Sequence, residues 1–293
     1  MKKTIYYCGF FLIFFSILFY GCKKKESVIS PSIADENIQS TQDNAIIDGE
    51  FSNVFSYVDS QGEISFSSTQ EKKSMNVPLT PRKSELIPDC ATLDVDSVNK
   101  ILTIDFGSSN CLCRDGIYRK GKIMIKFTGQ WRTKGSNATV TLLDYYVNNK
   151  LVQGRKSITI MDINNFGPIK WNVVITNASI NTNFGLISWN ANRIISKIKG
   201  AETPAILIDD EYSIDGSSSG INRNNVQFSV NTETSLIKAL NCTKKDFVDG
   251  ILTITNLDKG VSLTIDYNPT KTRACDKIAN VLLNGKVYQI TLR

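Results

Sequence analysis

Four acidic side chains form the densest group of candidate metal ligands in the sequence: Asp209, Asp210, Glu211 and, a few residues later, Asp215. Calcium binds several hard oxygens around a tight turn, and Gly216 follows the last of these acids. The alternate spacing of acids in an EF-hand is missing, and an acidic strand end leading into a turn explains the group equally well. We therefore favour the second interpretation and expect no metal ion or other cofactor.

The 293-residue chain contains no histidine. This excludes Ser-His-Asp and Cys-His catalysis, histidine-bearing zinc sites and histidine-ligated haem. Hydrolysis of a glycosidic bond remains open because it needs only two carboxylates at a set separation. Such a pair could come from Asp105, Asp115, Asp209 or Glu211.

Aromatic side chains suggest a different chemistry, the stacking of sugar rings. The candidates for ligand contact are Trp131, Trp189 and the adjacent Tyr145 and Tyr146. Asparagines near Trp189 in the sequence could pair with sugar hydroxyls. The competing interpretation is that tryptophans in β proteins fill cores, whereas one of two adjacent tyrosines in a strand must face outward.

The N-terminus predicts export and lipid attachment. Two lysines precede an apolar run from Ile5 to Tyr20, which is shorter than the roughly 20 residues that span a bilayer. Gly21 and Cys22 then resemble the end of a lipobox, although Phe19 stands where a leucine is usual. We expect residues 1–21 to be a signal peptide, Cys22 to carry acyl chains such as palmitate, and the protein to be anchored to the outer membrane, on either face.

Charge argues against a nucleic-acid partner. Cleavage after Gly21 removes two of the 34 basic side chains and none of the 28 acidic ones, which leaves a net charge of +4. Part of this charge is the run Lys23–Lys25, which would lie against anionic lipid head groups. Clustered cations interleaved with aromatics, the usual nucleic-acid footprint, are not found.

The remaining chain divides by composition. Residues 22–85 are mostly polar, and we predict a flexible, disordered tether with a small ordered patch at Phe51–Phe66. From residue 86 to 293, short runs alternate apolar and polar residues, as in Val261–Tyr267, and turn signals such as Asn284-Gly285 separate them. This predicts an all-β antiparallel meander forming a sandwich or a rolled sheet, with a helix at most at Thr234–Leu240. Whether it is one domain or two similar halves dividing near 180–200 stays open.

A weak internal repeat organises the cysteines. Leu102–Phe106 and Leu263–Tyr267 match, and each has one cysteine upstream and at least one downstream. The repeat predicts two disulfides in an exported chain: Cys90 with Cys111 or Cys113, and Cys242 with Cys275. One cysteine is then left over, and we expect it to be buried.

Several segments resemble uncharacterised lipoproteins of Bacteroidota-type Gram-negative bacteria. They include LTIDFGSSNCLCRDGIYRKGKIMIKFTG, DYYVNNKLVQGRKSITI, LISWNANR and CDKIANVLLNGKVYQITL, and together touch most of residues 90–293. The resemblance implies an envelope lipoprotein of β structure and brings no activity. We therefore expect a non-enzymatic binding or interaction module whose ligand is a glycan, a lipid or a protein. The alternatives are a carboxylate-based hydrolase of envelope polysaccharide and a purely structural envelope protein.

Overall fold

The computed structural model describes residues 31–66, 83–163, 169–203, 206, 208–242 and 247–291. Within them, one antiparallel sheet contains all fourteen strands, and its spatial order follows the sequence, except that the short β3 pairs with β4 beside the main path. The strands are β1 (Thr92–Asp96), β2 (Ile101–Asp105), β3 (Cys111–Leu112), β4 (Tyr118–Phe127), β5 (Asn137–Val147), β6 (Lys150–Asp162), β7 (Ile169–Thr182), β8 (Gly185–Lys199), β9 (Glu211–Ile221), β10 (Gln227–Ala239), β11 (Asp249–Asn256), β12 (Val261–Asp266), β13 (Ile278–Leu283) and β14 (Lys286–Thr291).

The antiparallel β class predicted from the alternation of side chains is confirmed. In β11 every second residue is buried, ending with Leu252, Ile254 and Asn256, and in β12 Leu263 and Ile265 face the same core. Because side chains alternate across a strand, one face of the sheet is apolar and must be covered. The first described element of the chain supplies that cover.

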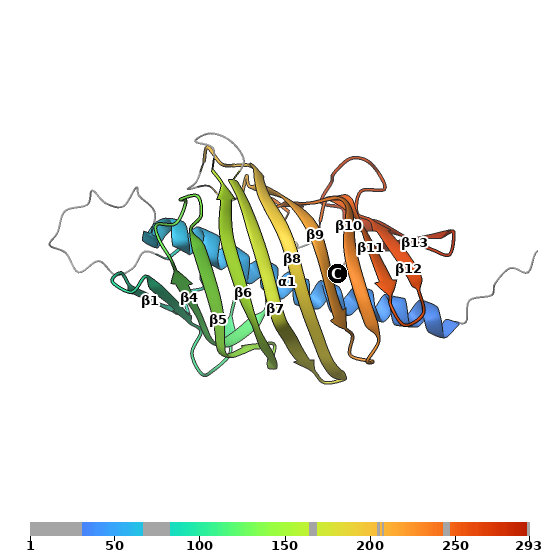
Figure 1. Ribbon diagram of the computed structural model, residues 1–293, viewed down its shortest axis with the longest axis horizontal. Helices are drawn as coiled ribbons and strands as arrows, with labels where there is room; N and C mark the ends of the chain where they lie inside the picture. The colour runs from blue at the N-terminus through green and yellow to red at the C-terminus, as the bar shows by residue number, and fades with distance from the viewer. Residues whose placement is uncertain are drawn as a thin grey trace, which may run out of the picture.

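This cover is a single long helix, α1 (Pro31–Phe66), which lies against the sheet (Figure 1). The prediction of a tether was wrong for residues 31–50, whereas the ordered patch expected at Phe51–Phe66 is the second part of this helix. The buried positions of α1 do follow helical spacing, but polar residues occupy many of them, including Asn37, Ser40 and Asn44 before Ile47 and Phe51. A buried stripe that mixes polar and apolar residues leaves no hydropathy period in the sequence. Residues 22–30, including Cys22, lie outside the described residues.

The helix crosses the sheet diagonally. Near its start, the Asn37 side chain donates a hydrogen bond to the Val261 carbonyl at the beginning of β12, 3.4 Å away. At its end, the Phe66 carbonyl accepts a hydrogen bond of 2.8 Å from the Trp131 amide between β4 and β5. Consequently α1 crosses eight strands of the sheet, from β12 to β5, and passes from one row of strand ends to the opposite row.

The sheet bears on two further points, a division that the sequence left open and a helix that it suggested. The proposed division into halves near 180–200 falls inside the longest strand pair, where β7 and β8 are matched from Ile169–Lys197 to Thr182–Gly185. The helix expected at Thr234–Leu240 falls largely within β10. Leu236 and Ala239 are both buried there, three residues apart, which imitates helical spacing, although the register with β9 is continuous from Leu236 to Ala239.

Two disulfides, Cys90–Cys111 and Cys242–Cys275, are present as predicted, and Cys113 is the buried free thiol. Each disulfide joins the chain before one hairpin, β1–β2 or β11–β12, to the chain after it. The turns of the two hairpins have the same hydrogen-bond pattern. Asp96 accepts hydrogen bonds from the amides of residues 98 and 99, and Asn256 does so from those of residues 258 and 259.

Candidate functional site

Most charged groups inside the molecule hold α1 to the sheet. Each acidic side chain described on the helix forms an ion pair with a lysine or arginine of the sheet or its turns. The pairs are Glu36–Lys259, Asp43–Arg223, Asp48–Arg193, Glu50–Arg119, Asp59–Arg132 and Glu63–Arg132. Buried charges need such partners because an unpaired charge is very costly away from water.

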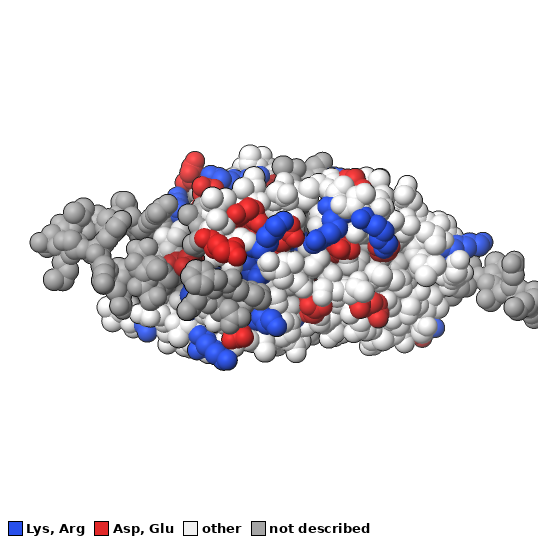
Figure 2. All heavy atoms as spheres, turned by 90° about the horizontal axis from the view of Figure 1, so that it is seen from above, with Lys and Arg blue, Asp and Glu red and all other residues white. Residues whose placement is uncertain are grey.

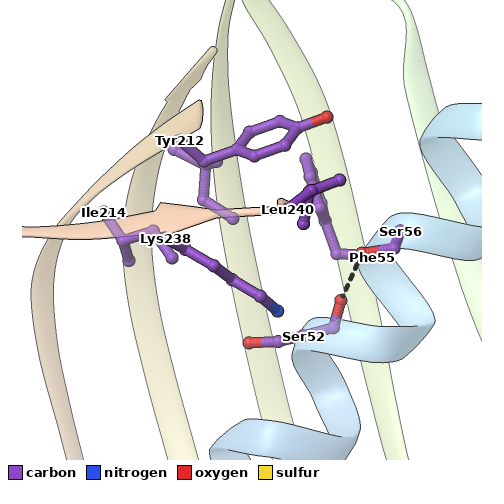
Figure 3. Close-up of a pocket in the computed structure, with 8 residues that line it drawn as sticks. Ser52, Phe55, Ser56, Tyr212, Ile214, Lys238 and Leu240 are labelled. Carbon is purple, nitrogen blue, oxygen red and sulfur yellow. Dashed lines mark hydrogen bonds between the residues drawn. The ribbon is translucent and has the colours of Figure 1, made fainter. Parts of the chain in front are cut away.

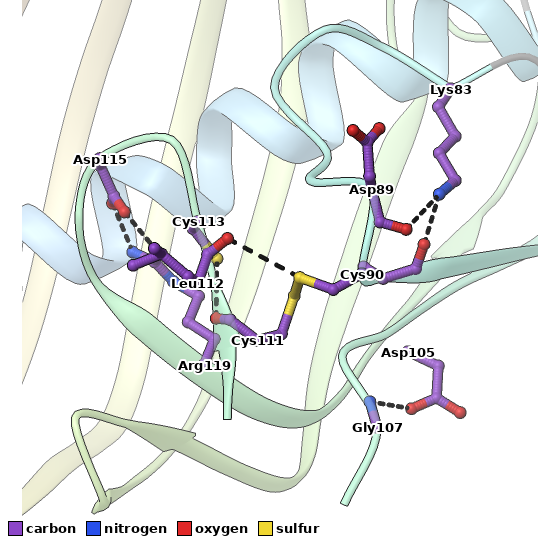
Figure 4. Close-up of a disulfide and its surroundings, with 11 residues drawn as sticks. Lys83, Asp89, Cys90, Asp105, Gly107, Cys111, Leu112, Cys113, Asp115 and Arg119 are labelled. Atoms are coloured by element: carbon purple, nitrogen blue, oxygen red, sulfur yellow. Dashed lines mark hydrogen bonds and ion pairs between the residues drawn. A yellow bond between two sulfur atoms is a disulfide. The ribbon is translucent and has the colours of Figure 1, made fainter. Parts of the chain in front are cut away.

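Arg119 forms the most enclosed of these sites. Its guanidinium is fully buried and lies 2.9 Å from Glu50 and 2.8 Å from Asp115, which belongs to the loop before β4 (Figure 4). The Tyr145 hydroxyl donates to Glu50 over 2.7 Å. Burial alone would lower the pKa of Arg119, but Glu50 and Asp115 outweigh it and raise that pKa, while burial raises the pKa of Tyr145. Arg119 therefore keeps its charge over the accessible pH range.

The aromatic platform considered for a glycan is not formed, and the tryptophans fill the core, which is the interpretation that the sequence favoured. Trp131, Tyr145 and Trp189 are completely or almost completely buried. The indole of Trp131 donates to Asp59 over 3.1 Å, and that of Trp189 donates to Asn44 over 3.0 Å, so both bind α1. Only Tyr146 is partly exposed, with the Lys120 ammonium 4.6 Å from its ring centre. The alternation argument therefore identified one of the four aromatic candidates as reachable from solvent.

The calcium candidates do not converge on one point. Asp210 is buried against Lys197 at 2.8 Å, Glu211 pairs with Lys199 at 2.7 Å, and Asp215 accepts a hydrogen bond from Ser235. Asp209 accepts one from Thr203. Among the described residues, no group of three or more potential ligands is arranged to hold a metal ion. Glu211 and Asp215 lie on one face of β9, but four residues separate them by about 13 Å along the strand, which is too far for one ion, and Asp209 and Asp210 precede the strand.

The carboxylates considered for glycoside hydrolysis are likewise divided. Asp105 pairs with Lys122 on β4, and Asp115 pairs with Arg119 on the same strand. Asp209 and Glu211 lie at the start of β9, five strand positions away from β4. At roughly 4.8 Å per strand this is about 24 Å, whereas the two carboxylates of a glycosidase lie at most about 9.5 Å apart. A catalytic pair drawn from both regions is therefore excluded.

A shallow recess opens beside the middle of α1, where the helix passes β8–β10 (Figure 3). Its apolar lining comes from helix and sheet together: Phe55, Ile195, Tyr212, Ile214 and Leu240. Ser52 and Ser56 from α1 and Lys238 from β10 add two hydroxyls and an amine. The recess encloses about 310 Å³ including the solvent at its open mouth. It is an indentation in the surface rather than a closed ligand cavity.

Sequence reasoning missed the residues that bind α1 to the sheet, namely the helix acids and their cationic partners. One signal was present: Glu36, Asp43 and Glu50 recur at intervals of seven residues, as side chains on one helix face do. Nothing local identified Arg119 or Arg193 as buried. Asp115 is close to Arg119 in sequence, but the helix partners Glu50 and Asp48 lie 69 and 145 residues away from Arg119 and Arg193.

Charge is mixed over the edge of the molecule seen in Figure 2, where lysines and arginines alternate with acids instead of gathering in one patch. None of the helices in the described part of the chain is long and apolar enough to cross a membrane. No family model, no curated protein and no solved structure matches this sequence or fold. The function must therefore be argued from the molecule's own surface.

Proposed function

We propose that the protein is a lipid-anchored component of the cell envelope that acts by binding a partner protein, and that the recess beside α1 is a contact site. The observation that carries this proposal is the position of the recess. It is the place where apolar side chains, hydroxyls and an amine from α1, β8, β9 and β10 meet at an open surface. Elsewhere, Trp131, Tyr145 and Trp189 bind the helix, and the candidate acids pair with separate side chains of the sheet and its loops.

The shape and lining of the recess favour one kind of contact. Ligand pockets that enclose a small molecule are deep and bury most of its surface, but this one is open. It suits a single projecting apolar side chain of a larger partner, the arrangement found at the centre of protein interfaces. A glycan is not favoured, because Trp131 and Trp189 are buried.

Export and anchorage rest on residues 1–22. Mass spectrometry of the purified full-length product should find the chain starting at Cys22 with acyl chains attached, and Cys22→Ala should lose both features. A chain that begins at Met1, or an unmodified Cys22, would contradict the anchor. This test is independent of the recess.

The recess is tested by placing a photo-crosslinking amino acid at Ser52 in growing cells. The same amino acid at Lys170, an exposed position of β7, is the control. We expect an adduct with one defined protein from position 52 that Leu240→Glu abolishes, and no such adduct from position 170. Leu240 is only half-buried, so the variant should fold, which circular dichroism checks. An adduct insensitive to Leu240→Glu, or none at position 52, would refute this site.

A further inference from the structure

Three turns on one edge of the sheet join the first half of α1 in a continuous surface, which we call the lower rim. They lie between β7 and β8 (183–184), β9 and β10 (222–226), and β11 and β12 (257–260), at the bottom of Figure 1. Arg223 and Lys259 in two of these turns pair with Asp43 and Glu36 of the helix. The Leu257 amide donates to the Gln227 carbonyl, which links the second turn to the third.

Large apolar side chains are exposed along this rim. Phe184 is 78% exposed, Leu186 54%, Leu257 51% and Ile221 39%. Single exposed apolar residues are ordinary, but several on adjoining turns form a patch that usually marks a contact surface. Arg223 and Lys259 of the rim are paired with acids of the helix. Moving the rim into a less polar medium therefore costs less free energy than moving unpaired charges would.

The position of the anchor decides which edge of the sheet faces the membrane. Pro31 begins α1 nine residues after Cys22, and nine residues span at most about 32 Å when fully extended. Strand β8 has 15 residues, which corresponds to about 50 Å between the two edges of the sheet. The helix begins beside the β11–β12 turn, as the bond from Asn37 to Val261 shows. The lower rim is therefore the edge nearer to the start of the helix, and an acylated Cys22 can reach a bilayer that touches this rim.

We propose that the lower rim docks on the lipid bilayer, with Phe184, Leu186, Ile221 and Leu257 entering the interfacial region. This inference rests on the proposed lipid anchor and adds a second attachment. One shallow apolar insertion binds a membrane only marginally, but it becomes effective when an acyl anchor holds it at the surface. Lys23–Lys25, next to the anchor, contribute attraction to anionic lipid.

The docking fixes the orientation of the recess. Its residue Ile195 on β8 lies ten positions beyond Gly185, the first residue of that strand at the rim. At about 3.3 Å per residue this places the recess roughly 33 Å from the bilayer surface. Its position is within reach of a soluble partner or of the domain of another envelope protein.

The experiment uses the full-length lipidated protein in vesicles of phosphatidylethanolamine and phosphatidylglycerol, with and without brominated acyl chains. Phe184→Trp places a fluorophore on the rim. Ile198→Trp is the matched control, because Ile198 is 46% exposed at the other end of β8. The three native tryptophans are buried and provide the background spectrum of the parent protein. Acylation of Cys22 is measured by mass spectrometry on the same sample.

We expect brominated lipid to quench the added fluorescence of Phe184→Trp and to leave that of Ile198→Trp unchanged. A second variant, Phe184→Asp with Leu257→Asp, should lower the fraction of protein protected from proteolysis on vesicles without changing its circular dichroism. Equal quenching at both positions, or none at position 184 in acylated protein, overturns the docking and leaves the anchor standing. A sample in which Cys22 carries no acyl chains overturns both the lipid anchor and the docking that rests on it.

Discussion

Lys156 is a charged residue whose surroundings oppose its charge. Its side chain points from β6 to the helix, where the ammonium donates to the Phe51 carbonyl and lies 5.3 Å from the ring centre of Phe55. Burial lowers the pKa of Lys156 to about 7, and the more distant Asp48 offsets this only in part. Unlike Arg119, which has two carboxylates in contact, Lys156 has no ion pair among the described residues. It is therefore a source of pH-dependent stability.

The sign of that dependence follows from proton linkage. In the unfolded chain Lys156 stays protonated up to about pH 10.5, but in the folded chain it releases its proton near pH 7. Between these values the unfolded state binds more protons, so the free energy of unfolding should rise with pH, by up to about 1.4 kcal/mol per unit. Below pH 7 Lys156 is charged in both states. The full free-energy cost of burying its charge then applies, and this residue no longer changes the free energy of unfolding with pH.

Urea unfolding of the parent and of Lys156→Met from pH 6 to pH 9, with disulfides intact, measures this contribution. The difference between the two proteins cancels the titration of other groups. We expect Lys156→Met to be the more stable protein at pH 6 and its advantage to shrink toward pH 9. Parallel pH profiles would show that Lys156 does not titrate in this range.

At the scale of elements, α1 behaves as part of the core and not as a leash. From Ile47 to Phe66 none of its residues is classed as exposed, whereas Ile38, Gln42, Ala45 and Ile46 form an exposed stripe in its first half. Ion pairs fix its position along the sheet, and aromatic contacts such as Phe55–Trp171, with ring centres 5.3 Å apart, fill the space between them. The helix packs closely against the sheet at Gly62, where an added methyl group would lie 3.0 Å from the side chains of Phe127 and Trp131.

Two glycines of the helix give a matched test. Gly49→Ala adds a methyl group into open space and should stabilise the protein by about 0.5–1 kcal/mol through helix propensity. Gly62→Ala gains the same propensity but presses on Phe127 and Trp131, so we expect a net loss of stability of about 1–3 kcal/mol. Thermal or urea unfolding of the two variants should therefore shift in opposite directions. Shifts of the same sign would mean that α1 does not pack against Trp131 as described.

At the scale of the whole molecule, the disulfides close both ends of the sheet. Cys90–Cys111 lies beside β1 and β2 at one end, and Cys242–Cys275 brackets β11 and β12 near the other. The first also fixes the loop that carries Asp115 to Arg119. A meander of this length has two edge strands and many long-range pairings, so covalent closure restricts the unfolded chain at both ends of the sheet order.

Removal of each disulfide should lower stability by an amount set by loop length. The sequence separations of 21 and 33 residues correspond to about 3 and about 4 kcal/mol in the chain-entropy estimate. Paired Cys→Ser variants measured by urea unfolding check these values.

Peptide mapping without reduction should find the two linkages. Burial raises the pKa of the Cys113 thiol and should keep this thiol from alkylation until the protein unfolds. A linkage between Cys90 and Cys242 would contradict the fold.

The sequence by itself determined the antiparallel strands and, apart from the choice between Cys111 and Cys113, the disulfide pairing. The alternation of Leu102, Ile104 and Leu263, Ile265 is a local property, because each strand's faces follow from its own residues. The repeated hairpin placed the cysteines at equivalent points, although it left Cys111 and Cys113 as alternatives. The strands needed only the hydropathy of neighbouring residues, and the disulfides needed the comparison of two similar segments of the chain.

Only the tertiary structure decided the fate of the polar helix, the aromatic residues and the acids. Glu50 and Arg119 are 69 residues apart, and Glu36 and Lys259 are 223 apart. A polar side chain can be buried only where its partner is present, and that partner is fixed by the path of the chain and not by its neighbours in sequence. For this reason a segment with the composition of a tether lies at the centre of the molecule, and three of the four aromatic residues considered for a sugar platform lie in the core.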